Sequence, residues 1–146
     1  MDECTFCQII RGKISAYTVF ENNNSIAFLD KRPLFPGHTL LIPKTHISIL
    51  AEMPNELIGP FFETARNLSV AVEKAMKAQG SFVALNNRVS QSVPHLHVHI
   101  VPRTRGDGLR GFFWPRKNYK NEAEMIEVTN KIKTAIPMKP RKASLS

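Results

Sequence analysis

The chain has 146 residues, of which 42% are hydrophobic and 22% charged, and a net charge of +8, a composition typical of one folded domain. It contains no run of about 20 apolar residues, which excludes a membrane-spanning helix, and two cysteines are too few for a disulfide-rich scaffold. The acidic start of the chain lacks the apolar stretch of a secretory signal, so we expect a cytoplasmic domain with no membrane partner.

The first third of the chain predicts a short helix followed by three strands. The helix is expected at residues 5–11 and ends at Gly12. Three apolar segments are typical of strands and lie at residues 17–21, 25–30 and 39–42. Three consecutive asparagines predict a hairpin turn between the first two strands, because asparagine tolerates positive φ angles.

A longer helix is expected at residues 55–79, ending at Gly80. Six apolar residues recur there at spacings of three or four, which indicates one stripe that faces the core: Leu57, Phe61, Ala65, Leu68, Val72 and Met76. Pro60 is expected to kink or break the first turns, because proline lacks the N–H that the helix needs for its hydrogen bonds.

The rest of the chain predicts two further strands, at residues 82–85 and 95–101, and a last helix at residues 122–136. Five short strands without regular strand–helix alternation predict an α+β fold with a mostly antiparallel sheet. We assign residues 1–136 to one domain. Residues 137–146 carry three basic residues and no acidic one, and we assign them to a basic, disordered tail.

Three of the five histidines, His95, His97 and His99, alternate with apolar residues in one predicted strand. Alternate residues of a strand share a face, so we expect the imidazoles on one face and the apolar residues in the core. A solvent-facing strand that carries histidine by chance is one explanation. Two chemical alternatives are a three-histidine metal site that activates water and a histidine nucleophile beside a phosphate.

The residues around the histidines favour the phosphate alternative. A catalytic metal site often uses a carboxylate, and none lies between Glu73 and Asp107. Small polar and basic residues flank the strand instead: Asn86, Ser90, Gln91, Ser92, Arg103 and Arg105. An imidazole that is neutral near pH 7 is suited to attack a phosphorus atom.

Four ordered segments resemble the motifs of the histidine triad (HIT) family. They are residues 4–12, 28–30, 36–46 and 91–101, the last of which contains all three alternating histidines. The resemblance implies a small α+β domain whose five-stranded sheet continues across a homodimer. It also implies a hydrolase that acts at the α-phosphate of a purine nucleoside phosphoramidate or a dinucleoside polyphosphate. His97 would form a nucleotidyl intermediate, with no catalytic metal.

The same resemblance implies roles for other residues. His99 would contact the phosphate and help to move the proton, and His38 would support the catalytic site. The expected substrate-binding residues are Phe28 at the base, Asp30 at the ribose, Asn86 near the ribose and phosphate, Gln91 and Ser92 at the phosphate or leaving group, and Trp114, reaching the partner subunit's site.

Cys4 and Cys7 have the spacing of half a tetrahedral zinc site, although two buried, inert cysteines would give the same pattern. A redox pair is less expected, because no strand precedes Cys4. In zinc-containing relatives of the resembled family, the other two ligands correspond to His46 and His95. The complete set predicts a structural Zn²⁺ with no open position for water.

Two segments depart from the family pattern. Residues 86–91 contain no glycine, which leaves the phosphate contacts of this loop open. Residues 103–120 carry six basic residues and one acidic residue, which indicates either a phosphate-rich partner or a solvated loop. Two other functions stay open: a nucleotide-sensing protein with weak catalysis, and a nucleic-acid-binding protein, which is disfavoured because no second DNA-binding module is present.

Overall fold

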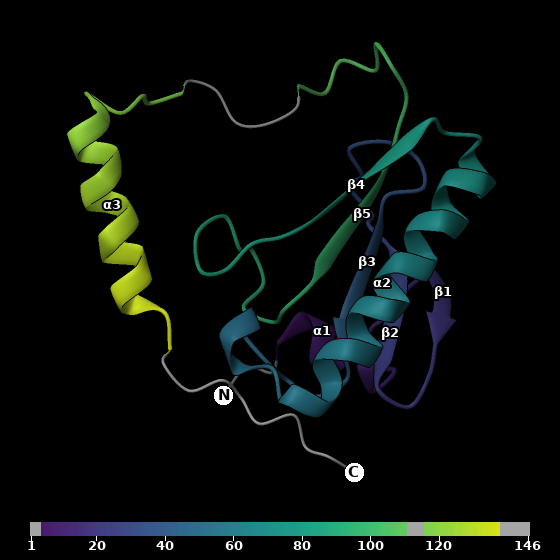
Figure 1. Ribbon diagram of the computed structural model, residues 1–146. Coiled ribbons are helices and arrows are strands. Elements are labelled where there is room, and N and C mark those ends of the chain that lie inside the picture. The colour runs from purple at the N-terminus through teal and green to yellow at the C-terminus, as the bar shows by residue number, and fades with distance from the viewer. Residues whose placement is uncertain (1–3, 111–115, 138–146) are drawn as a thin grey trace. The chain divides into compact units, whose positions relative to one another are not determined.

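The computed structural model describes residues 4–110 and 116–137, which fall into two compact units divided after Asp107. The first unit is built on an antiparallel five-stranded sheet with the strand order β1-β2-β3-β5-β4 (Figure 1). The strands are β1 (Thr18–Glu21), β2 (Ser25–Leu29), β3 (Thr39–Pro43), β4 (Gly80–Leu85) and β5 (Val98–Arg103). The predicted α+β fold is confirmed.

The helix α2 (Asn55–Met76) covers one face of this sheet (Figure 1). Its apolar stripe packs on sheet residues that point to the same side, among them Leu41, Val98 and Ile100. The helix runs through Pro60 without a break, and it ends at Lys77, which adopts a left-handed conformation. The expected end at Gly80 is therefore wrong, because that glycine already begins β4.

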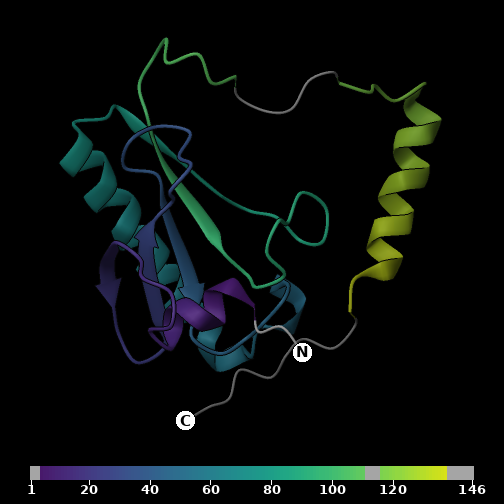
Figure 2. The same cartoon turned by 180° about the vertical axis from the view of Figure 1, so that it is seen from behind.

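The short helix α1 (Thr5–Ile10) lies on the opposite face of the sheet, which Figure 2 brings to the front. Its Phe6 is buried against apolar residues of β2 and β3, namely Ile26, Phe28, Leu40 and Ile42. The sheet thus separates two apolar clusters, and the polar residues that carry the candidate chemistry gather on the α1 side.

The histidine segment differs in part from its prediction. The strand β5 starts at Val98, so His95 and His97 lie in the irregular segment before it, and only His99 belongs to the ladder. The expected separation of faces still holds. Leu96, Val98 and Ile100 are buried in the core beneath α2, and the ring of Phe6 contacts the imidazoles of His95 and His97 on the other face.

The second unit contains the helix α3 (Glu122–Ala135), whose N-terminus is capped by the side chain of Asn121 accepting the N–H of Glu124. The predicted last helix is therefore confirmed. Trp114 and most of the predicted basic tail lie outside the described residues. Within the part of the chain that the structure describes, no helix is both long and apolar enough to cross a membrane.

Candidate functional site

Cys4, Cys7, His46 and His95 converge from three separate parts of the chain. The two cysteines belong to the start of α1, His46 follows β3, and His95 precedes β5. Each cysteine Sγ lies 3.3 to 3.6 Å from each histidine Nδ1, and the two Nδ1 atoms are 3.2 Å apart. A tetrahedral zinc ion at ordinary bond lengths requires about 3.5 Å between nitrogen and sulfur and about 3.3 Å between two nitrogens. The four ligand atoms therefore fit zinc.

Hydrogen bonds around the cluster prepare its atoms for a cation. The Nε2–H of His95 donates to the Pro43 carbonyl at 2.8 Å, which leaves the Nδ1 lone pair directed at the cluster. Burial lowers the pKa of His95 and keeps this nitrogen unprotonated. Burial, assisted by the Cys4 thiol, raises the pKa of Cys7 to about 11, so a bound metal is needed to make it a thiolate at neutral pH.

His97 is held with one nitrogen free. Its Nδ1 lies 2.8 Å from the carbonyl oxygen of His95, which can only accept, so Nδ1 carries the proton and Nε2 carries a lone pair. The side chain is 4% exposed, and the Phe6 ring packs edge-on against its ring with centroids 5.2 Å apart. These two contacts fix the imidazole in the tautomer that a nucleophile requires.

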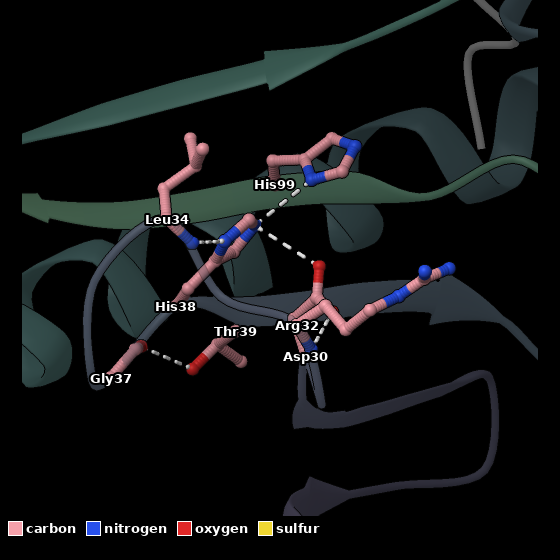
Figure 3. A network of polar contacts seen from close by, with 7 residues as sticks. All are labelled: Asp30, Arg32, Leu34, Gly37, His38, Thr39 and His99. Atoms are coloured by element: carbon pink, nitrogen blue, oxygen red, sulfur yellow. Dashed lines mark hydrogen bonds and ion pairs between the residues drawn. The ribbon is translucent and has the colours of Figure 1, made fainter. Parts of the chain in front are cut away.

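Asp30, His38 and His99 form a second polar cluster (Figure 3), and the ring of His99 also contacts that of His97. His38 Nε2 lies 3.0 Å from His99 Nδ1 and 3.7 Å from a carboxylate oxygen of Asp30, and the backbone N–H of Leu34 donates to His38 Nδ1. Burial lowers the pKa of His38. Burial, followed by the charges of His97 and His38, lowers the pKa of His99 to about 4. Both imidazoles are therefore neutral at physiological pH.

This shift predicts how stability depends on pH. An unfolded histidine has a pKa near ~6.5, so between that pH and about 4 the unfolded chain binds more protons at His99 than the folded protein does. We expect the melting temperature to fall as the pH falls through this range, and to fall less steeply in His99→Gln. Equal slopes for the two zinc-loaded proteins in thermal melts at several pH values would contradict this assignment.

A cavity of 270 Å³ lies on the α1 side of the sheet, and Phe6, which lines it, also contacts the rings of His95 and His97. Phe28 and Asp30, both expected to bind substrate, line it together with residues that the sequence prediction missed, namely Thr5, Phe6 and Ile9 of α1 and Leu40 of β3. The sequence does contain a sign of this apolar wall, because Phe6 and Ile9 lie one helical turn apart in the predicted first helix, beside the two cysteines. The cavity combines apolar walls with a carboxylate at its rim.

The loop between β4 and β5 uses its polar side chains to hold its own shape. The Gln91 side chain donates to the Ser48 carbonyl and accepts the Arg88 N–H at 2.8 Å, and Asn86 donates to the Ser90 carbonyl at 3.2 Å. Arg88 and Ser90 adopt positive φ angles of 68° and 60°. This conformation is one that glycine reaches at lower cost, about 1–2 kcal/mol per residue. Exposed Ser92 follows this loop.

One predicted basic residue has a structural partner. Arg103 donates to both carboxylate oxygens of Asp107, with Nε to Oδ2 at 2.7 Å and Nη2 to Oδ1 at 3.1 Å. This paired geometry closes the turn after β5. Arg103 is thus paired with Asp107. The expectation that residues 103–120 bind phosphate therefore rests on the other basic residues of that segment.

Comparison with known proteins identifies relatives that match most of the chain. The family model of the HIT domain matches residues 11–106. Adenylylsulfatase HINT3 of Arabidopsis thaliana is 34% identical over 110 residues, which cover 74% of this chain and 56% of that protein. The crystal structure of a HIT family protein from Bacillus subtilis superposes with a TM-score of 0.84 at 32% identity, over 94% of this chain and all of that one. A zinc-bound histidine triad family protein from Mycobacterium smegmatis superposes with a TM-score of 0.70 at 31% identity, over 91% of this chain and 97% of that one.

Proposed function

The chain belongs to the HIT family, and from that premise we propose that it is a nucleotide hydrolase acting at a nucleoside α-phosphate. Its substrate is a purine nucleoside phosphoramidate or a dinucleoside polyphosphate. The observation that carries the proposal is the tautomer of His97, whose Nδ1–H is held by the His95 carbonyl and whose ring packs on Phe6, a residue that also lines the cavity shared by Phe28 and Asp30. The plant relative is an adenylylsulfatase, which supports hydrolysis at an adenylyl phosphorus.

In the proposed first step, His97 Nε2 attacks the α-phosphorus while the bond to the leaving group breaks. The leaving group departs with the electron pair of that bond and takes a proton from solvent. The resulting imidazolium keeps its Nδ1–H on the His95 carbonyl, which spreads the positive charge that forms on the ring. The Nε2–H of His99 donates to a non-bridging phosphate oxygen and stabilises its negative charge.

In the second step, water attacks the same phosphorus and the bond from phosphorus to His97 Nε2 breaks. The nucleoside monophosphate leaves, the released proton goes to solvent, and His97 returns to its neutral tautomer. In this proposal Asp30 accepts ribose hydroxyls, and Phe28 and Phe6 contact the base; all three line the cavity, and the two rings have centroids 5.6 Å apart.

The direct test is turnover of two substrates by the purified protein. Adenosine phosphoramidate and diadenosine tetraphosphate are incubated separately, and the products are quantified by chromatography. Release of AMP from the first alone assigns the activity to phosphoramidates, and cleavage of the second assigns it to dinucleoside polyphosphates. Tight AMP binding without turnover of either substrate would overturn the hydrolase and support a nucleotide-sensing protein.

The wall of the cavity offers a separate prediction. Ile9→Glu places a carboxylate in the apolar wall opposite the expected base, so the KM for adenosine phosphoramidate should rise by about tenfold or more, the cost of about 1.4 kcal/mol of lost binding. Ile10→Glu on the same helix is the matched control, because Ile10 does not line the cavity. Equal KM values in steady-state assays of the two variants would place the nucleoside elsewhere.

We also propose a homodimer in which β4, an edge strand of the sheet, pairs with β4 of a second copy. Val83 on β4 is 45% exposed, so this edge strand presents apolar surface beside backbone groups that no neighbouring strand of the sheet pairs. Sedimentation velocity of the wild-type protein should give the mass of two chains. A monomer at micromolar concentration would contradict this arrangement.

A further inference from the structure

The two histidine clusters have similar ligand atoms but different surrounding hydrogen bonds. Asp30, His38 and His99 place their ligand atoms within 4.8 Å of one another, as the cysteine cluster does. The backbone N–H of Leu34, however, donates to His38 Nδ1 at 3.1 Å (Figure 3). An N–H can only donate, so Nδ1 has no proton and the single proton of neutral His38 is on Nε2. A metal on Nε2 would have to displace that proton and leave an imidazolate.

Among the residues that the structure describes, the proton on His38 Nε2 has one acceptor within hydrogen-bonding distance. His99 Nδ1 lies 3.0 Å away, whereas the nearer oxygen of Asp30 is 3.7 Å away, beyond hydrogen-bonding distance. Asp30 is instead engaged by the backbone N–H of Arg32, which donates to its other oxygen at 2.9 Å. His99 Nδ1 is therefore an acceptor, and the proton of neutral His99 is on Nε2.

We propose that His38 is a positioning residue that holds His99 in the tautomer with a protonated Nε2, through the chain of hydrogen bonds from Leu34 N–H to His38 to His99. This inference rests on the proposed function, in which that N–H is the donor to the phosphate. With the opposite tautomer, His99 would present a lone pair to a negatively charged oxygen. The cost of losing one such donor is about 10²–10³-fold in kcat.

The surroundings of His38 support a fixed, neutral relay. Its side chain is 3% exposed, and a second proton on Nδ1 would oppose the Leu34 N–H directly. The ionisable groups that face the pair are the Asp30 carboxylate and the imidazole of His97, whose ring centroid is 4.9 Å from that of His99. The loop that carries the Leu34 N–H is closed at its base, where Asp30 N–H donates to the His38 carbonyl at 2.9 Å.

Two neutral amide variants separate the two hydrogen bonds of His38. His38→Gln carries an N–H donor at the distance of Nε2 and can still donate to His99. His38→Asn has an amide at the distance of Nδ1, so it can accept from Leu34 but does not reach His99. We expect the glutamine variant to keep kcat within about threefold of wild type and the asparagine variant to lose about 10²-fold in kcat with little change in KM. A purely structural role would predict similar losses for both.

The tautomer itself is measured without any substrate. Long-range ¹H–¹⁵N spectra of ¹⁵N-histidine-labelled protein at pH 7 should show His99 with unprotonated Nδ1 in the wild type and in His38→Gln, and a mixture of tautomers in His38→Asn. Asp30→Asn should leave this tautomer unchanged while raising KM. A protonated His99 Nδ1 in the wild type, or equal effects of the two amides, would overturn the proposal. Absence of turnover would refute only the proposed function.

Discussion

Replacing His97 with alanine is expected to lower kcat by about 10⁴-fold or more, because loss of the nucleophile in a covalent hydrolase costs up to about 10⁶-fold. The His95 carbonyl holds the Nδ1–H of this imidazole and the Phe6 ring packs edge-on against it, so the ring is fixed with its lone pair on Nε2. Binding of AMP should persist, because the cavity walls belong to other residues. Steady-state assays and titration calorimetry on the same variant measure the two effects.

Two further measurements separate loss of the nucleophile from loss of the fold. His97→Gly leaves space at the ring position, so added imidazole should restore part of the turnover by attacking phosphorus in place of the side chain. In the wild type, rapid quenching in base followed by mass spectrometry should detect a nucleotidyl adduct that is absent in the alanine variant. Substantial turnover by His97→Ala, with an unchanged melting temperature, would eliminate the covalent mechanism.

The sheet and the helices could be predicted largely from the sequence because their signals are local. The apolar stripe of α2 and the alternation around Val98 each specify one buried face, and both are buried as expected except at Met76, the last residue of α2, which is 42% exposed. The residues at which helices and strands begin and end were harder to predict. Lys77 ends α2 in a conformation that usually favours glycine, and residues 95–97 stay outside the ladder because His95 turns toward the cysteine cluster instead.

The candidate site was predictable as a set of residues but not as a set of hydrogen bonds. The motif spacing names His97 and His99, whereas the proton position on each ring depends on single backbone groups, the His95 carbonyl and the Leu34 N–H. These groups come from loop geometry that no side-chain pattern encodes. The engagement of Gln91 with Ser48 and Arg88 is of the same kind. The substrate-binding role expected of Gln91 stays a prediction, and the geometry adds that its side chain also shapes the loop.

Removing the metal is expected to destabilise the protein and to weaken nucleotide binding together. Phe6 lies between the two cysteines and lines the cavity, so the metal would cross-link α1, which supplies one cavity wall, to the segment that carries His97. A ligand 1,000-fold above its Kd stabilises the folded state by about 4 kcal/mol. For a chain of this size that corresponds to about 10 °C in Tm. Chelation followed by thermal melts and AMP titration measures both losses.

Variants at His46 distinguish the metal from the side chains that hold it. His46 is exposed and directs only its Nδ1 at the cluster, so His46→Cys should retain zinc as a Cys3His site, whereas His46→Ala should lose it. We expect the cysteine variant to keep its metal content, Tm and AMP affinity, and the alanine variant to match the chelated wild type. If His46→Ala keeps full AMP affinity after its zinc is lost, then α1 holds its place by the packing of Phe6 on Phe28 and His97, and the metal contributes stability alone.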